Sequence, residues 1–184
     1  KMGGDCLNYG CVPSKALIKT AKLMRQMQHS RQYGIHSAEA TMNFADAMER
    51  VAQVIREIEP HDSVARYTSL GVDVVQGSAK IVDPWHVQIT GADGATRTLS
   101  TRAIVVATGA APFVPPLPGL ADVGVLTSDT LWGLRELPKR LVVLGGGPIG
   151  CELAQAFARL GSQVTQIEML PRIMVREDEE VSAY

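Results

Sequence analysis

Two cysteines near the start of the chain have a spacing that could support disulfide redox chemistry. Cys6 and Cys11 lie in the segment GGDCLNYGCVPSK, residues 3–15. In a regular α-helix, residues five apart have Cα atoms about 8.6 Å apart, which exceeds the roughly 7 Å that a disulfide can bridge. A bond therefore requires the segment to leave helical geometry. We expect this at Asn8 and Gly10, because both residue types tolerate unusual backbone angles.

The same cysteines have two ordinary interpretations, unreactive thiols or half of a zinc site, and the C-x₄-C spacing alone does not decide. Zinc needs two further ligands, and neither Cys151 nor any histidine offers a matching pair at short spacing. We assign no metal site and no catalytic histidine, and we interpret Cys151 as a packing residue. Cys11 falls where a helix should begin, so helix N–H groups and the helix dipole would stabilise its thiolate.

A glycine-rich loop later in the chain is typical of dinucleotide binding. It follows an apolar strand and opens a helix, which is the context that a G-x-G-x-x-G motif requires, and it consists of Gly145, Gly146, Gly147, Pro148, Ile149 and Gly150. Gly145 would form the tight turn, Gly147 would let the backbone approach a pyrophosphate, and Gly150 would allow close packing of helix on strand. Free N–H groups at the helix N-terminus would hold the phosphates.

Two glutamates accompany this loop. Glu168 ends the next strand, 168 − 150 = 18 residues after Gly150, close to the roughly 20 expected for a carboxylate that binds ribose hydroxyls. A carboxylate there repels a 2′-phosphate, so we expect NAD, although Arg172 and Arg176 keep NADP possible. Glu152 is placed in the first turn of the helix, where it would interact favourably with the helix dipole.

Hydrophobic periodicity predicts the elements that position these residues. Helices are expected over residues 13–32 and 44–58, the second ending before Pro60. Short β-rich runs predict a small antiparallel meander, with strands at 72–75, 79–82, 86–90 and 96–100 and a turn at 93–94. The apolar run 104–107 is typical of a strand buried on both faces. A strand–helix–strand unit is expected at 141–144, 149–160 and 163–167.

Composition excludes several classes of protein. The 184 residues carry 18 Lys+Arg against 19 Asp+Glu, a net charge of −1, and 46% of them are hydrophobic. This leaves no basic field for nucleic acid, and the chain is too apolar to stay unfolded. No apolar run approaches the roughly 20 residues that span a bilayer, and three cysteines are too few for a secreted disulfide scaffold. We expect a cytoplasmic protein with neither nucleic acid nor membrane as a partner.

The segment around the cysteines resembles the class I pyridine nucleotide-disulfide oxidoreductases, the family of dihydrolipoamide dehydrogenase, glutathione reductase and mercuric reductase. Their motif GG-x-C-x₄-C-x-P-[SK]-K is matched throughout residues 3–15. The resemblance implies that Cys6 is the interchange thiol exposed to substrate and that Cys11 faces the flavin. It also implies that Lys15 lies beside the reactive edge of the flavin and forms an ion pair with Glu152.

The resemblance also implies two cofactors, FAD and NAD(P). Thr108 and Gly109 match a second flavin-binding signature, and Ala79 matches a position whose backbone meets the adenine. The implied fold is α/β, with parts of two Rossmann-like nucleotide-binding domains and the small meander. Residues 1–117 would form a partial FAD-binding domain with the redox helix, and residues 118–184 a partial NAD(P)-binding domain. Five prolines and glycines predict a linker over residues 112–119.

The implied activity is that of an oxidoreductase passing electrons between NAD(P)H, FAD and the Cys6/Cys11 disulfide. The substrate would be a small dithiol or disulfide, as in dihydrolipoamide dehydrogenase, or a soft metal ion, as in mercuric reductase; Glu168 speaks against a glutathione reductase. The alternative is a non-catalytic redox-sensing or nucleotide-binding module that uses the same disulfide. The family's first glycine loop and its His-Glu pair are not in the chain, so we interpret it as a fragment, inactive alone, of a homodimeric enzyme.

Overall fold

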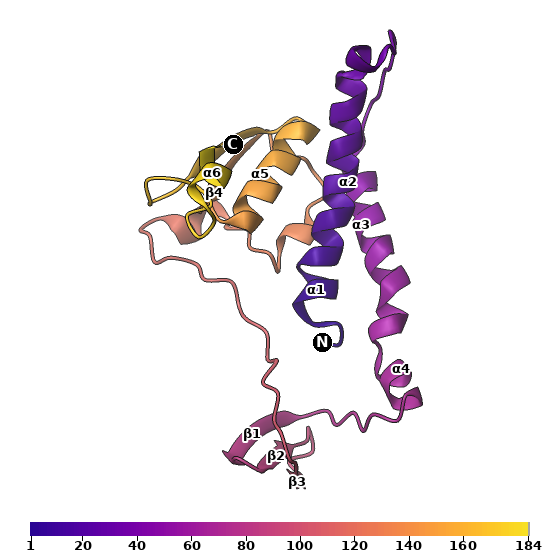
Figure 1. Cartoon of the computed structure of the whole chain (residues 1–184), viewed down its shortest axis with the longest axis vertical. Helices are drawn as coiled ribbons and strands as arrows, with labels where there is room; N and C mark the ends of the chain where they lie inside the picture. Colours follow the sequence, from indigo (N-terminus) through magenta and orange to yellow (C-terminus); the bar gives the residue numbers. More distant parts are fainter. Residues whose placement is uncertain (184) are drawn as a thin grey trace. The chain divides into compact units, whose positions relative to one another are not determined.

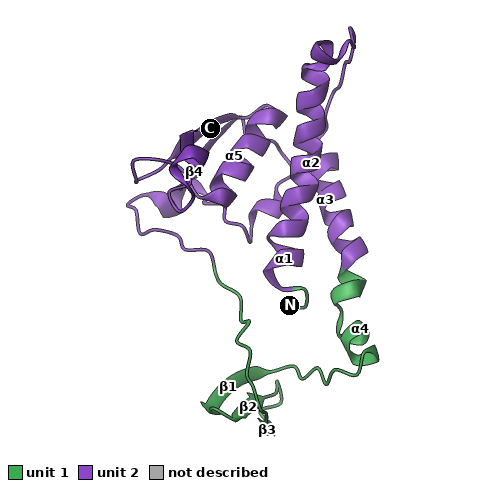
Figure 2. Ribbon diagram, in the orientation of Figure 1, with its two compact units in different colours: residues 1–3, 59–111 green, residues 4–58, 112–184 purple. Residues whose placement is uncertain are grey.

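The computed structural model describes residues 1–183, which divide into two compact units (Figure 2). Unit 1 comprises residues 1–3 and 59–111, and unit 2 comprises residues 4–58 and 112–184. The fold is mixed α/β, which confirms the predicted class. The predicted nucleotide-binding domains, with their boundary between residues 117 and 118, stay a prediction.

The helices that carry the cysteine motif belong to unit 2 (Figure 1). The short helix α1 (Gly4–Asn8) is followed by α2 (Cys11–Gln28), which begins at the predicted place with Pro13 in its first turn. A proline is favourable there because its missing N–H would have no helical acceptor. A 3₁₀ turn, η1 (Ser30–Tyr33), continues α2 toward the predicted end. The described residues contain no helix both long and apolar enough to cross a membrane.

Helix α3 (Phe44–Ile58) has the predicted bounds. The Asn43 side chain caps it, because its Oδ1 accepts hydrogen bonds from the N–H groups of Ala45 at 2.9 Å and Asp46 at 3.3 Å. Such a cap satisfies backbone donors that the first helical turn leaves unpaired. The 3₁₀ turn η2 (Glu59–Asp62) follows at the proline that was expected to end the helix.

The strand–helix–strand unit is confirmed in the second half of unit 2. Strand β4 (Arg140–Leu144) leads through the glycine loop to α5 (Pro148–Leu160), and α5 leads to β5 (Gln163–Ile167). The two strands are parallel, with Arg140 opposite Gln163 and Leu144 opposite Ile167. Parallel neighbours require a crossover connection, and α5 provides it. The last described helix is α6 (Glu179–Ala183).

One hydrophobic core holds α2 against α5. Helix α2 packs against both α3 and α5, and the rings of Phe44 on α3 and Phe157 on α5 lie 6.1 Å apart. The other buried members of the core are Ala16, Leu17, Ala21, Met48, Val51, Leu131, Ala156 and Leu160. The core therefore fixes the position of α2 relative to α5, and with it the distance between the two predicted sites.

Unit 1 contains α4 (Val64–Ser69) and the predicted antiparallel meander. Its strands β1 (Ser78–Asp83), β2 (His86–Thr90) and β3 (Thr96–Ser100) pair in chain order. Gly94 forms the predicted turn between β2 and β3 with φ +79°, and its N–H donates to the carbonyl of Gly91 at 3.0 Å.

Two predicted strands are wrong. Residues 72–75 and 104–107 adopt neither helix nor strand. In the second segment, Val105 is 87% exposed and Val106 is 67% exposed, so the expected burial is also absent. A strand forms only where a neighbouring strand pairs with its backbone N–H and C=O groups, and the described residues offer neither segment such a neighbour. Residues 112–119 contain no helix or strand, as expected, and their role as a linker between domains stays a prediction. The 3₁₀ turns η3 (Leu120–Val123) and η4 (Leu131–Gly133) follow them.

We predict that Phe157→Ala lowers the free energy of unfolding by about 3–5 kcal/mol, because it removes a buried ring and leaves a cavity. Urea denaturation followed by circular dichroism would measure the loss. Phe113→Ala is the matched control, because Phe113 is 85% exposed, and it should change stability by less than about 0.5 kcal/mol. Equal losses in the two variants would contradict the described core.

Candidate functional site

The segment between Cys6 and Cys11 interrupts the helix, as predicted. The N–H groups of Tyr9 and Gly10 both donate to the carbonyl of Asp5, at 2.9 and 2.6 Å, and α2 then begins at Cys11. A Cβ atom on Gly10 would lie 3.1 Å from the Asp5 carbonyl oxygen and 3.8 Å from the Cys6 Cα. A larger residue at position 10 would thus be crowded, because the chain turns back closely on the residues around the first cysteine.

Asn8 plays a different part from the one predicted. It belongs to α1 and does not have a positive φ, so the expectation that it supplies an unusual backbone angle is wrong. Its side chain is buried, and Nδ2 donates a hydrogen bond to the Gly4 carbonyl at 2.9 Å. A side chain that bonds to its own local backbone is typical of asparagine, and here it stabilises the short helix that carries Cys6.

Both cysteines are exposed. Cys11 is the first residue of α2, which confirms its expected place at a helix N-terminus. Among residues 1–183, no three His, Cys, Asp or Glu side chains gather as potential metal ligands. Both residues thus lie at the surface, and the disulfide between them stays a prediction.

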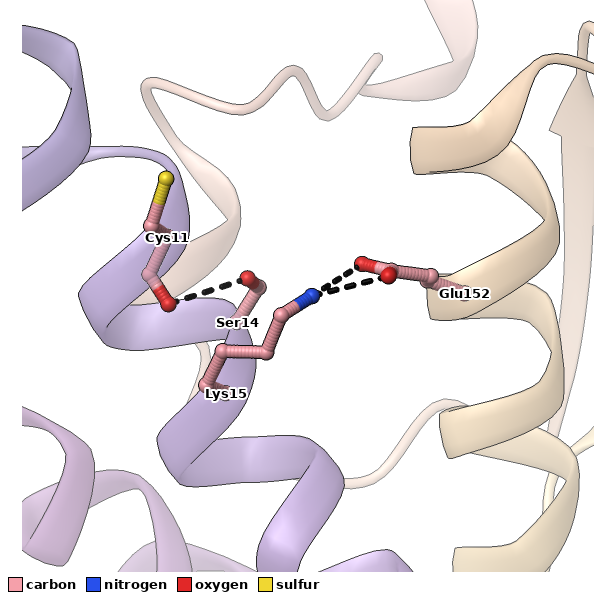
Figure 3. Close-up of polar contacts among 4 residues, drawn as sticks. All are labelled: Cys11, Ser14, Lys15 and Glu152. Atoms are coloured by element: carbon pink, nitrogen blue, oxygen red, sulfur yellow. Dashed lines mark hydrogen bonds and ion pairs between the residues drawn. The ribbon is translucent and has the colours of Figure 1, made fainter.

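Lys15 and Glu152 form the ion pair that the resemblance implied (Figure 3). The Lys15 Nζ lies 2.8 Å from Oε1 and 2.7 Å from Oε2 of Glu152, so one ammonium engages both carboxylate oxygens. The side chains are 60% and 47% exposed. Exposed pairs contribute little to stability, so we interpret this pair as a positional contact. On the same helix, the hydroxyl of the neighbouring Ser14 donates to the carbonyl of Cys11, which lies about one turn before Lys15, at 3.2 Å.

The interpretation of Glu152 as a partner of the helix dipole is wrong. Helix α5 begins at Pro148, so Glu152 is its fifth residue, and the first turn contains no acidic residue. The dipole effect falls off within the first turn. The position of Glu152 is instead accounted for by Lys15.

The first and last glycines of the loop, Gly145 and Gly150, have the predicted tight turn and close packing. Gly145 has φ +107°, which only glycine adopts readily, and its N–H donates to the Ile167 carbonyl at 2.8 Å. A Cβ atom on Gly150 would collide with the Gly145 carbonyl oxygen, whereas one on Gly147 would meet nothing within 4 Å. Pro148 is the first residue of α5, and the neighbouring Ile149 is 68% exposed. The loop is thus closely packed at Gly150 and open at Gly147.

Glu168 lies directly beside the loop. Its Oε2 accepts a hydrogen bond from the Gly146 N–H at 2.6 Å, and its Oε1 accepts one from the Leu170 N–H at 2.8 Å. These N–H groups, Leu170 first and Gly146 second, hold the pKa of the Glu168 carboxyl below its ordinary value, because they favour the charged form. The predicted proximity of Glu168 to the loop is confirmed, and its predicted contact with ribose stays a prediction.

Sequence reasoning missed Gln166, which holds the first loop carbonyl. Its Nε2 donates to the Gly145 carbonyl at 2.9 Å and lies 3.4 Å from the Cys151 Sγ. Cys151 is half-buried, and its Sγ also lies 3.4 Å from the Gly146 carbonyl. Gln166 stands two residues before Glu168, and residues two apart share one face of a strand. That spacing is the signal that could have identified it.

Arg172 is already engaged within the chain. Its guanidinium donates to the carbonyls of Met174 at 3.2 Å, Val175 at 3.1 Å and Glu177 at 3.1 Å, and to the Ser182 hydroxyl. Met174 in turn donates its N–H to the Gly146 carbonyl at 2.7 Å. Arg172 therefore organises the segment that borders the loop, and its expected bearing on the choice between NAD and NADP stays a prediction.

The residues matched to FAD-binding positions lie in unit 1. Ala79 is exposed on β1, opposite Ile89. Thr108 and Gly109 are exposed and outside helix and strand, with φ +73° at Gly109. The predicted contacts of all three with FAD stay predictions.

Comparison with known proteins decides the family. The sequence profile described as "Pyridine nucleotide-disulphide oxidoreductase" matches residues 1–184. The chain belongs to this family. It is 37% identical over 185 residues to a dihydrolipoyl dehydrogenase of Mycoplasma pneumoniae, covering 98% of this chain and 39% of that protein. It is 33% identical over 181 residues to a mercuric reductase of Lysinibacillus sphaericus, covering 98% of this chain and 32% of the relative.

Solved structures show the same relationship. LpdA from Mycobacterium tuberculosis superimposes with a TM-score of 0.80 at 27% identity, covering 98% of this chain and 40% of its own. A Cu(II) complex of the HOCl-induced flavoprotein disulfide reductase RclA from Escherichia coli superimposes with a TM-score of 0.75 at 30% identity, covering 99% of this chain and 37% of its own. The chain thus spans between about a third and two fifths of the length of these relatives.

We predict that Glu168→Gln lowers stability at pH 7 and that the difference from the wild type narrows as the pH falls. The lowered pKa means that the carboxylate contributes fully above its ordinary value of 4.5 and that this contribution is lost as the pH falls through the lowered value. Thermal unfolding between pH 7 and pH 3 would measure it. Glu39→Gln removes the same charge from an exposed glutamate, and an equal loss of stability at pH 7 in that control would contradict the role of Glu168.

Proposed function

We propose that the protein to which this chain belongs is a flavin-dependent disulfide oxidoreductase that passes electrons between NAD(P)H, FAD and the Cys6/Cys11 pair. The observation that carries the proposal is the contact of the Lys15 ammonium with both oxygens of Glu152. It joins the helix that starts at Cys11 to the helix that starts at the glycine loop. A dithiol and a nucleotide loop on adjoining helices are what a two-electron relay requires.

The residues around the loop fit a nicotinamide dinucleotide. The open side of Gly147 leaves room for a pyrophosphate near the N-terminus of α5, where backbone N–H groups bind anions. Glu168, held as a carboxylate by two N–H groups, would accept hydrogen bonds from ribose hydroxyls and repel a 2′-phosphate. We therefore propose NAD rather than NADP.

The two cysteines would have separate roles. When bound, the flavin accepts two electrons from the nicotinamide and supplies them to the disulfide. Reduction would then break the bond between Cys6 and Cys11, and the two sulfur atoms would take up two electrons and one proton, leaving a Cys6 thiol and a Cys11 thiolate. Cys6 would exchange with the substrate, and Cys11, at the helix N-terminus, would remain a thiolate. Lys15 would face the flavin, oriented by Glu152.

The relatives' names support two substrate classes. One relative is named a mercuric reductase and another a dihydrolipoyl dehydrogenase, so we propose a soft metal ion or a small dithiol or disulfide as the substrate. A homodimer in the cytoplasm is also part of the proposal. A non-catalytic sensor would form the same disulfide without turnover, so steady-state assays with dihydrolipoamide and with Hg²⁺ separate the two functions.

We predict that two-electron reduction of the full-length holoenzyme produces a long-wavelength absorbance band from a thiolate beside the flavin. Cys11→Ser should abolish the band, because Cys11 is the thiol proposed to face the flavin, whereas Cys6→Ser should retain it. Anaerobic titration followed by absorbance spectroscopy measures both variants. The reverse pattern would exchange the two roles, and no band in the wild type would contradict the proposed function.

We predict that Glu168→Arg raises the ratio of kcat/KM for NADPH to kcat/KM for NADH by at least roughly tenfold, equivalent to about 1.4 kcal/mol. Replacing a carboxylate by a guanidinium removes the repulsion of a 2′-phosphate and adds a partner for it. Glu39→Arg makes the same change of charge on an exposed residue outside the loop and should leave the ratio unchanged. An unchanged ratio in both variants would refute the ribose role of Glu168.

A further inference from the structure

One carbonyl in the segment between the cysteines cannot be satisfied by its own helix. In an α-helix, the carbonyl of residue i accepts from the N–H of residue i+4. For Tyr9 that residue is Pro13, which has no N–H. The next carbonyl, that of Gly10, has its regular donor, because the Ser14 N–H lies 3.0 Å away. The carbonyl that lacks a helical donor is therefore that of Tyr9, at the point where the chain bends.

Trp132 supplies this donor from a distant part of the sequence. Its indole Nε1 lies 3.0 Å from the Tyr9 carbonyl oxygen, 123 residues away along the chain. Trp132 belongs to η4, whose Leu131 is 6% exposed and part of the core. The indole is half-buried and packs against the same core. The donor is thus anchored on the framework that also fixes α2.

We propose that Trp132 is a positioning residue for the redox pair, through the hydrogen bond from its indole N–H to the Tyr9 carbonyl. A regular helix holds residues five apart too far apart to be bridged, so the bend is a precondition of the disulfide. By satisfying a carbonyl at the bend, Trp132 stabilises the conformation in which Cys6 and Cys11 can bond. The inference rests on the proposed function, because it assumes that this disulfide forms.

The test is a redox titration of the chain against mixtures of glutathione and glutathione disulfide. As the bond between Cys6 and Cys11 forms, the two thiols lose two electrons and two protons, and one glutathione disulfide becomes two glutathione molecules. Thiol trapping and peptide mass spectrometry measure the fraction of Cys6 and Cys11 that is oxidised, separately from Cys151. In Trp132→Phe, the equilibrium constant for disulfide formation should fall at least threefold relative to the wild type.

Trp85→Phe is the matched control. The sequence contains two tryptophans, and Trp85 lies 57% exposed in unit 1, so its replacement should leave the equilibrium constant within a factor of two. This variant also provides a background with Trp132 as the remaining tryptophan. There, biosynthetic replacement of Trp132 by benzothienylalanine keeps the bicyclic shape and removes the N–H, and it should reproduce the fall without the loss of packing that phenylalanine could cause.

The outcomes separate the role of Trp132 from the proposed function of the cysteine pair. An unchanged equilibrium constant with benzothienylalanine would overturn the role of Trp132 while leaving the disulfide and the proposed function in place. A fall in Trp132→Phe that benzothienylalanine does not reproduce would assign the effect to packing and would also overturn the inference. Failure of the wild-type pair to form a disulfide would refute both.

Discussion

The packing of α2 against α5 is the interaction on which the candidate site depends. The two helices share one apolar core with α3, and buried apolar surface supplies most of the stability of such an arrangement. Their polar residues, Lys15 and Glu152, meet at the edge of this core. An exposed ion pair alone could not hold two helices together. The core places the helices, and the ion pair joins their polar residues at its edge.

Backbone hydrogen bonds from other parts of the chain hold both the cysteine bend and the glycine loop. At the cysteines, the chain is bent. The N–H groups of Tyr9 and Gly10 donate to the Asp5 carbonyl in α1, and the Tyr9 carbonyl accepts from the Trp132 indole. At the glycine loop, the close approach at Gly150 fixes the loop, while the Glu168 carboxylate occupies the Gly146 N–H. In both places a side chain from another segment holds a backbone group of a predicted site: the Tyr9 carbonyl in one and the Gly146 N–H in the other.

Much of the fold could be predicted, because it follows from local patterns. Helical periodicity predicted α3, alternation and a turn predicted the meander, and the glycine motif predicted the strand–helix–strand unit. The buried strand predicted at residues 104–107 is absent, because an apolar sequence indicates a buried strand only when neighbouring strands are present to cover it. The contact of Trp132 with Tyr9 could not be predicted from spacing, because tertiary packing brings together two segments that lie 123 residues apart.

The most direct test of the account is a count of thiols during reduction by NADH. The oxidised full-length holoenzyme would be titrated anaerobically with NADH, and the new thiols would be alkylated and located by mass spectrometry. The account predicts two new thiols for each NADH consumed, one at Cys6 and one at Cys11. Oxidation of NADH without the appearance of thiols at these two positions would contradict it.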